Sequence, residues 1–309
     1  MVSYNVNILL LTILLFFLGV IGVIWWFQYR ILFFPSQTTG REPPQPYQQI
    51  FLGIDAVPLA MPKPGATESI SAWYFKFAQQ KDDKTIMFCH GNNGNISWRG
   101  YIVDLCQFLG VNLLLFDYRG YGQSVGIPTP ETICQDGIIV YEWLRTFCSA
   151  ENVFLWGESL GGAVAVHVAS RKPCARLICM STFSSLDDIV INKSIPRWLA
   201  IPSSLVVKVL CNNLPNKSKI RTVKSPIAVM HSVDDEMIPY PCARNLYDAI
   251  GHDQKLFLEI KGAHSAPEIT QEQVYELVKF CGFDFARTDT SGFLEAWLET
   301  LRSNLFSEL

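Results

Sequence analysis

The stretch from Asn152 to Val166, NVFLWGESLGGAVAV, constrains the fold of this 309-residue chain more than any other. It begins with a short apolar run of strand character, passes through GESLG centred on Ser159, and continues into small residues of helical character. A serine on so tight a turn adopts strained backbone dihedrals, so its neighbours must carry small side chains or none. The turn lifts the hydroxyl clear of the strand, and the N-terminus of the following helix favours negative charge beside it. The stretch therefore predicts that Ser159 is a nucleophile.

The rest of the chain alternates between strand-like and helix-like segments. Helical character is seen at residues 96–108, 130–147, 271–280 and 293–306, besides the helix after Ser159. Continuous apolar strands that alternate with helices are typical of a mainly parallel sheet covered on both faces. The sequence thus predicts an α/β fold with an eight-stranded sheet. Its strands are expected at residues 47–53, 69–77, 85–89, 111–116, 153–156, 175–180, 226–230 and 255–260.

Four motifs occur in order along the chain: HGNNGN from His90, FDYRGYGQS from Phe116, GESLGGAVAVHVAS from Gly157, and G-x-H ending at His264. With the apolar N-terminal stretch, they resemble the membrane-anchored serine hydrolases of the α/β-hydrolase family over roughly residues 28–282. The resemblance implies the α/β-hydrolase fold, with the nucleophile on the G-x-S-x-G turn. One departure is Glu158, since relatives often have Arg or His beside the nucleophile. This difference bears on substrate preference rather than on mechanism.

The nucleophile needs a base to take its proton, and the base needs an acid to hold its tautomer. In this fold the nucleophile, the acid and the base follow in that order, each after a strand. Of the five histidines, only His264 follows the last predicted strand in the required order. His167 lies well inside the helix after Ser159, His231 comes too early, and His252 precedes a strand. We therefore predict that His264 is the base.

The acid is expected in the segment HSVDDEMIP, which follows the predicted strand at 226–230. The end of this segment resembles the family pattern D-x-x-[VI]-P, which selects Asp235. Asp234 is the alternative. The glycine that often opens the pattern is Ser232 here, a small departure from the family.

An oxyanion needs two preorganised hydrogen-bond donors. The first is expected to be the backbone N–H of Leu160, directly after the nucleophile. The second is expected from the loop after the strand at 85–89, where Asn92 is the candidate donor. In that loop His90 is expected to make a structural hydrogen bond rather than to act as a second base. The DYRGYG motif, with Asp117 and Arg119, is expected to organise the loop after its own strand.

An apolar stretch without charges covers residues 8–27. As a helix it would be about 30 Å long, which is the thickness of a bilayer's hydrocarbon core. Trp25 and Trp26 would lie at the interface. We expect one N-terminal transmembrane helix within residues 1–30, because a basic leader and a small-residue cleavage site are both missing. The positive-inside rule, applied to Arg30 and Arg41, places the body of the chain in the cytoplasm.

The remaining boundaries come from composition. Residues 31–46 are rich in Pro and Gln and are predicted to connect the membrane to a domain spanning residues 47–309. Within it, residues 182–224 hold apolar clusters broken by prolines and are predicted to form a small cap over the active site. The alternative is a crossover helix on the sheet. A net charge of −3 argues against a nucleic-acid partner. The nine cysteines lack metal-site spacing, so we expect no metal or cofactor.

The sequence thus predicts a hydrolase of carboxylic esters or thioesters that works through an acyl-enzyme. The apolar cap and the anchor favour a substrate with an acyl chain, such as a lysophospholipid, a monoacylglycerol or an S-acylated protein. The expected partners are therefore a small-molecule acyl ester or thioester and membrane lipid. Two alternatives remain open: a catalytically silent scaffold with the same fold, and a peptidase or acyltransferase that uses the same three residues.

Overall fold

The computed structural model describes residues 33–38, 40, 46–54, 58–59, 68–77, 84–193, 214–283 and 290–306, with five scattered positions between 11 and 22. Most of the apolar stretch at 8–27 therefore lies outside the described residues. Among the described residues, no helix is long and apolar enough to cross a membrane. The transmembrane helix stays a prediction.

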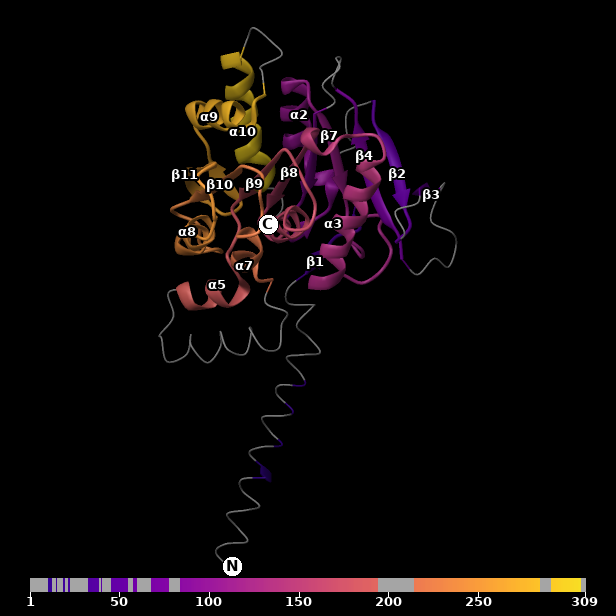
Figure 1. Ribbon diagram of the computed structural model, residues 1–309, viewed down its shortest axis with the longest axis vertical. Coiled ribbons are helices and arrows are strands. Elements are labelled where there is room, and N and C mark those ends of the chain that lie inside the picture. Colours follow the sequence, from indigo (N-terminus) through magenta and orange to yellow (C-terminus); the bar gives the residue numbers. More distant parts are fainter. Residues whose placement is uncertain are drawn as a thin grey trace, which may run out of the picture.

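One large twisted sheet runs through the domain (Figure 1). Its strands lie in the order β12-β11-β10-β9-β8-β5-β7-β4-β2-β3. From β7 to β11 neighbouring strands are parallel, whereas β4 runs antiparallel to both β2 and β7. The strands are β2 (Gln48–Leu52), β3 (Pro58–Leu59), β4 (Ile70–Phe75), β5 (Thr85–Cys89), β7 (Asn112–Phe116), β8 (Val153–Glu158), β9 (Arg176–Met180), β10 (Ile227–Ser232), β11 (Lys255–Ala263) and β12 (Ala266–Glu268).

Among the described residues the sheet has ten strands, so the predicted number of eight was wrong. All eight predicted strands are present, and the other two are the short edge strands β3 and β12, of two and three residues. Segments this short carry no readable periodicity. β12 forms because the chain after His264 folds back antiparallel onto the end of β11, where Ala263 pairs with Ala266.

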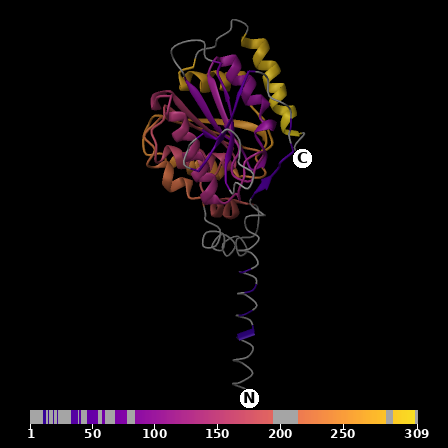
Figure 2. The same cartoon turned by 90° about the vertical axis from the view of Figure 1, so that its right-hand side faces the viewer.

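Helices cover both faces of the sheet (Figures 1 and 2). Core contacts place α2, α9 and α10 on one face and α3, α4, α7 and α8 on the other, and the short α5 packs beside α8. Thr129 and Thr270 begin α3 and α9 with capping boxes. The helices are α2 (Gly100–Leu109), α3 (Pro130–Arg145), α4 (Leu160–Ala169), α5 (Leu186–Asn192), α7 (Asn216–Ile220), α8 (Tyr240–Asp248), α9 (Gln271–Cys281) and α10 (Thr290–Phe306).

Helix α4, which follows Ser159, is the most deeply buried of these helices. All of its residues except His167 are buried. It packs closely against α3, since a Cβ on Gly137 would lie 2.6 Å from a methyl group of Val164. Close packing on every side fixes the position of the helix N-terminus and therefore of the residue before it.

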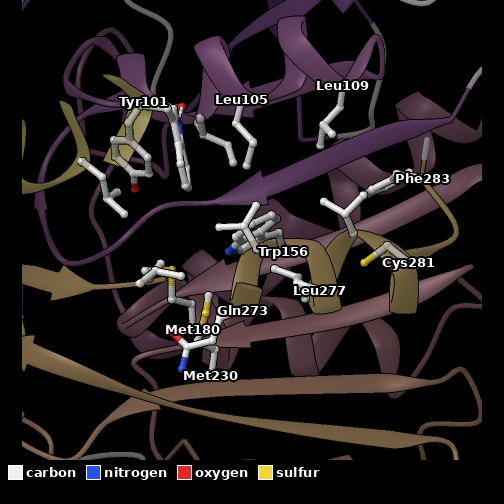
Figure 3. Close-up of a pocket in the computed structure, with 16 residues that line it drawn as sticks. Tyr101, Leu105, Leu109, Trp156, Met180, Met230, Gln273, Leu277, Cys281 and Phe283 are labelled. Atoms are coloured by element: carbon white, nitrogen blue, oxygen red, sulfur yellow. Dashed lines mark hydrogen bonds between the residues drawn. The ribbon is translucent and has the colours of Figure 1, made fainter. Parts of the chain in front are cut away.

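The core beneath α2 and α9 encloses a small apolar pocket of about 20 Å³ (Figure 3). Leu105 and Leu109 from α2 and Leu277 from α9 converge there over Trp156 of β8. The space is about that of one water molecule, and no charged side chain lines it. This pocket therefore belongs to the packed core, and the reactive groups lie elsewhere.

Two predicted segments need separate mention. Of the predicted cap at 182–224, the structure describes α5 and α7 with their flanking residues, and residues 194–213 lie outside the described part. Of the predicted connector at 31–46, residues 33–38, 40 and 46 are described, and the first of these ranges and residue 40 hydrogen-bond to the domain. Phe33 is buried, and β1 (Phe34–Pro35) pairs in parallel with β6 (Asn93–Gly94). The described residues of the predicted connector therefore pack against the domain, and the boundary at residue 46 stays a prediction.

Candidate active site

Ser159 lies on the sharp turn between β8 and α4, with φ 52° and ψ −118°. Such dihedrals are strained for a residue with a side chain and cluster at functional sites. The neighbouring glycines make the turn possible. A Cβ on Gly157 would lie 2.4 Å from the carbonyl oxygen of Gly161, and one on Gly161 would lie 2.0 Å from that of Cys89. The serine hydroxyl is therefore held at the carboxyl end of the sheet.

The structure brings the side chains of Ser159, His264 and Asp235 together. Ser159 Oγ lies 3.0 Å from His264 Nε2, and His264 Nδ1 lies 2.7 Å from Asp235 Oδ2. These contacts fit an imidazole that donates its Nδ1–H to the carboxylate and accepts the serine proton at Nε2. Three segments far apart in the sequence thus form one hydrogen-bonded chain at the ends of β8, β10 and β11.

The structure also separates the two carboxylates that the sequence left open. Asp235 is buried, and its Oδ1 accepts hydrogen bonds from the backbone N–H groups of Met237 (3.0 Å) and Ile238 (2.7 Å). Asp234 is exposed and accepts from the N–H of Gly262 at 3.3 Å. Only Asp235 contacts the ring of His264. Its two N–H donors hold the carboxylate in the orientation that this contact needs.

Carboxylates around His264 favour its protonated form. Burial opposes protonation, but the hydrogen bond and charge of Asp235 outweigh it, and the charges of Glu158 and Glu236 act in the same direction. The net result is a pKa above the ordinary value of 6.5. Glu236 also accepts a hydrogen bond from the backbone N–H of His264 at 3.0 Å. A base with a raised pKa takes a proton from a hydroxyl more readily.

A cavity of about 330 Å³ opens beside Ser159 and His264. Its wall is mainly apolar, and two of its apolar residues, Phe34 and Met237, are 56% and 54% exposed. These exposed side chains form the rim of the cavity. The remaining lining residues are Gly91, Asn92, Asn93, Arg99, Glu158, Met180, Ser181, Ser265 and Pro267.

Of the two residues predicted to supply oxyanion donors, Asn92 lines this cavity and Leu160 directly follows the lining residue Ser159. A Cβ on Gly91 would be 3.5 Å from the Cβ of Ser159, so the loop after β5 passes close to Ser159. Among the hydrogen bonds found for the described residues, the backbone N–H groups of Asn92 and Leu160 donate to no protein acceptor. Both groups are thus available to an oxyanion. Their role stays a prediction.

The other candidates lie outside this cavity. His90 is fully buried, its Nδ1 is 2.7 Å from the carbonyl oxygen of Gly91, and burial and the charge of Arg99 lower its pKa to about 3. Asp117 accepts the N–H of Ile96 at 2.9 Å. Arg119 pairs with buried Asp136 at 2.6 Å. These contacts brace loops next to the site, as expected for the DYRGYG motif.

Sequence reasoning missed several residues that shape the site. Phe34 was assigned to the connector, and Glu236 was one of three adjacent acidic residues without a role of its own. Arg99 lines the cavity although it is only 2% exposed, and its guanidinium donates to the carbonyl oxygen of Asn93. A buried arginine nine residues after His90 carries no separate sequence signal. Tyr121 lies in the recognised DYRGYG motif, but its hydroxyl contacts Asn92, which the motif does not reveal.

Comparison with known proteins supports the fold. A protein-family model described as the alpha/beta hydrolase fold matches residues 84–222. An uncharacterised protein of Mycobacterium tuberculosis is 29% identical over 258 residues, which cover 83% of this chain and 87% of that protein. Lysophosphatidylserine lipase ABHD12 of Danio rerio is 26% identical over 228 residues, 69% of this chain and 59% of the lipase. The chain thus spans little more than half the length of its ABHD12 relatives.

Solved structures give the same architecture. The esterase Pf2001 of Pyrococcus furiosus matches with a TM-score of 0.56 at 18% identity, over 86% of this chain and 99% of the esterase. The monoacylglycerol lipase of Paleococcus ferrophilus matches with a TM-score of 0.52 at 15% identity, over 76% of this chain and 99% of the lipase. At these identities the likeness concerns the fold alone.

Proposed function

The chain has the α/β-hydrolase fold and esterases and lipases among its relatives, and from this premise we propose that it is a serine hydrolase of acyl esters or thioesters. The observation that carries the proposal is the hydrogen-bonded chain from Ser159 through His264 to Asp235, at 3.0 and 2.7 Å. A nucleophile, a base and an orienting acid in this order are the parts that acyl transfer needs.

The proposed reaction has two halves. Ser159 Oγ attacks the carbonyl carbon while His264 Nε2 takes its proton, and the N–H groups of Asn92 and Leu160 stabilise the oxyanion. His264 then gives the proton to the leaving alcohol or thiol, and an acyl-enzyme remains on Ser159. Water attacks this ester with His264 again as base, which releases the carboxylic acid. Asp235 stabilises the imidazolium in both halves.

The proposed substrate carries an acyl chain. The cavity wall is mainly apolar, and the exposed rings and methyl groups of Phe34 and Met237 form its rim. Such a wall favours a hydrocarbon chain, since each buried methylene contributes about 0.8 kcal/mol. The name of the ABHD12 relatives, lysophosphatidylserine lipase, fits an ester of this class. A lysophospholipid, a monoacylglycerol or an S-acylated protein would each supply it.

Turnover of p-nitrophenyl esters of increasing acyl length, in detergent micelles, tests this proposal. We expect turnover to rise from acetate to medium and long chains, and to fall at least ~10³-fold in both Ser159→Ala and His264→Ala. Turnover at acetate length alone would exclude the acyl-chain part. Activity that persists in Ser159→Ala would mean that another residue is the nucleophile. Matched p-nitroanilides test the peptidase alternative, because an esterase should leave them intact.

We further propose that residues 8–27 hold the domain on a membrane, with the catalytic side in the cytoplasm. The support is the uncharged apolar stretch itself and the two arginines, Arg30 and Arg41, that follow it. Alkaline carbonate washing of membranes from expressing cells is the test. An anchored chain stays in the pellet, whereas release of the full-length chain into the supernatant contradicts an integral anchor.

A further inference from the structure

The residues that follow the apolar stretch lie against the loop that carries the second oxyanion donor. Phe33 is buried in the main core cluster and fixes the start of this segment. From there β1 runs parallel to β6, with Phe34 opposite Asn93 and Pro35 opposite Gly94. The segment thus adds a short strand to the loop that begins at the end of β5. The contact between Phe34 and Asn92 joins residues that are 58 positions apart in the sequence.

Hydrogen bonds continue along the segment. The Asn95 side chain donates to the carbonyl oxygens of Ser36 at 3.0 Å and Thr38 at 2.9 Å. The N–H of Gly122, in the neighbouring loop, donates to Ser36 O at 3.0 Å. The segment is therefore bound to both loops on this side of the cavity, and Asn95 is buried at the centre of these contacts.

The contact closest to the chemistry is made by Asn92. Its side-chain oxygen Oδ1 accepts the backbone N–H of Phe34 at 3.3 Å. The Tyr121 hydroxyl lies 3.1 Å from the same Oδ1 and 2.9 Å from the Asn92 carbonyl oxygen. One hydroxyl carries one proton, so it cannot satisfy both acceptors fully. The N–H of Phe34 is thus the second donor that holds the Asn92 side chain, and with it the direction of the Asn92 backbone.

We propose that residues 33–38 are a positioning element of the active site, which hold Asn92 so that its backbone N–H points at the oxyanion. The inference rests on the proposed serine hydrolase function and deepens it, because it makes the segment next to the predicted anchor part of the catalytic geometry. Oxyanion donors act through preorganisation, and a misplacement of about 1 Å lowers the rate by up to about 100-fold. Phe34 acts here through Asn92 and does not touch the reacting atoms.

The test compares two substitutions at one position in the full-length chain. Phe34→Pro removes the N–H that reaches Asn92, and Phe34→Ala keeps this N–H while removing the ring from the cavity rim. We expect Phe34→Pro to lower kcat about 10- to 100-fold relative to Phe34→Ala with little change in KM, and to slow fluorophosphonate labelling by a similar factor. The acid limb of the pH profile should be the same in both variants, because the segment does not contact His264. Equal kcat values in the two variants would overturn the inference.

Asn95→Asp disrupts the attachment of residues 33–38 in a second, independent way. It tests the positioning role of this segment if Phe34→Pro does not fold. An aspartate keeps the acceptor for the N–H and hydroxyl of Ser97 but loses the donor to Ser36 and Thr38. We expect the same loss in kcat together with a lower melting temperature, because the buried carboxylate would face two carbonyl oxygens, and wild-type kcat in the folded variant would contradict the proposal. Failure of the proposed function gives a different result, since the wild type itself would then neither label nor hydrolyse esters.

Discussion

Two pairs of Asp and His lie at the carboxyl ends of neighbouring strands, and they differ in every property that matters for catalysis. His264 and Asp235 follow β11 and β10, with 2.7 Å between Nδ1 and Oδ2. His90 and Asp117 follow β5 and β7, with 3.5 Å between Nε2 and Oδ1. Both pairs consist of the same residue types at the same edge of one sheet. Only the first reaches the serine and the cavity.

The surroundings of each pair account for the difference. Complete burial, together with the charge of Arg99, lowers the pKa of His90 to about 3, and burial raises that of Asp117 to about 7. The pKa of His264 is raised instead, because Asp235, Glu158 and Glu236 together outweigh its burial. The uncharged pair of His90 and Asp117 is therefore suited to a structural role in its loop, whereas the pair of His264 and Asp235 is suited to hold a proton during a reaction. Residue type alone does not distinguish them.

The largest expected effect separates the two histidines. His264→Ala should lower kcat at least ~10³-fold, because the proposed base is lost, and it should lower the free energy of unfolding less than His90→Ala does, because the His264 side chain is partly exposed to the cavity. His90→Ala should act mainly on the free energy of unfolding and much less on kcat. It removes a buried ring that lies 4.4 Å from Tyr118 and 5.3 Å from Tyr121, so we expect a loss of about 2–4 kcal/mol of stability.

Ester hydrolysis and denaturant unfolding in detergent, measured on both variants, provide the check. The comparison would be broken by a His90→Ala variant that is as stable as the wild type but loses as much activity as His264→Ala, a loss larger than displacement of the neighbouring Asn92 would cause. It would also be broken by a His264→Ala variant that keeps most of its activity.

A second prediction concerns the pH dependence of stability. Burial raises the pKa of Asp117 in the folded chain from its ordinary value of 3.8 to about 7, so between these values the folded state keeps a proton that the unfolded state has lost. Stability from this group is present at low pH and is lost as pH rises through that window. The pKa of His90 is about 3 in the folded chain against an ordinary value of 6.5, so its contribution to the free energy of unfolding increases as pH rises from 3 to 6.5. The two contributions oppose each other.

Asp117→Asn removes the first contribution and leaves the second. The free energy of unfolding of this variant should therefore rise more steeply between about pH 4 and pH 6.5 than that of the wild type. The measurement is urea unfolding at several pH values in this range. Asp234→Asn makes the same charge change at an exposed position and serves as the control. An identical pH slope in Asp117→Asn and the wild type would mean that Asp117 is ionised in the folded chain at these pH values.

The smallest expected effect comes from Glu158. Its carboxylate lines the cavity, accepts the hydroxyl of Tyr101, and contributes to the raised pKa of His264. Glu158→Gln keeps the shape and the acceptor but removes the charge. The pKa of His264 should then fall, so the acid limb of the kcat/KM profile should move to lower pH with a similar plateau. Glu259→Gln, at an exposed position on β11, is the matched control, and an equal acid limb in both variants would remove Glu158 from the account.

Much of this arrangement could be predicted from the sequence, because its signals are local. Continuous apolar runs revealed eight strands. The glycines around Ser159 revealed a strained turn, because a side chain at Gly157 would clash with the backbone of Gly161 and one at Gly161 would clash with the backbone of Cys89. The choice of Asp235 over Asp234 needed a family pattern, and the contact with His264 is a matter of three-dimensional geometry.

The remainder is non-local and leaves no periodicity. The pairing of Phe34 with Asn93 involves two-residue strands in a Pro-rich segment, so composition alone indicated a connector. The opposite pKa shifts of His90 and His264 depend on burial and on carboxylates from other elements. The membrane helix depends mainly, and the cap in part, on residues outside the described part of the chain, so both stay predictions.

The most direct test of the central claim is active-site labelling with a fluorophosphonate probe, followed by mass spectrometry of the labelled peptide. The probe phosphonylates only a serine that a neighbouring base activates. We expect one modified residue, Ser159, in the wild type, and no labelling in Ser159→Ala or His264→Ala. Labelling at another residue, or labelling that survives Ser159→Ala, would contradict the account. A folded wild-type protein that takes no label would favour a catalytically silent scaffold.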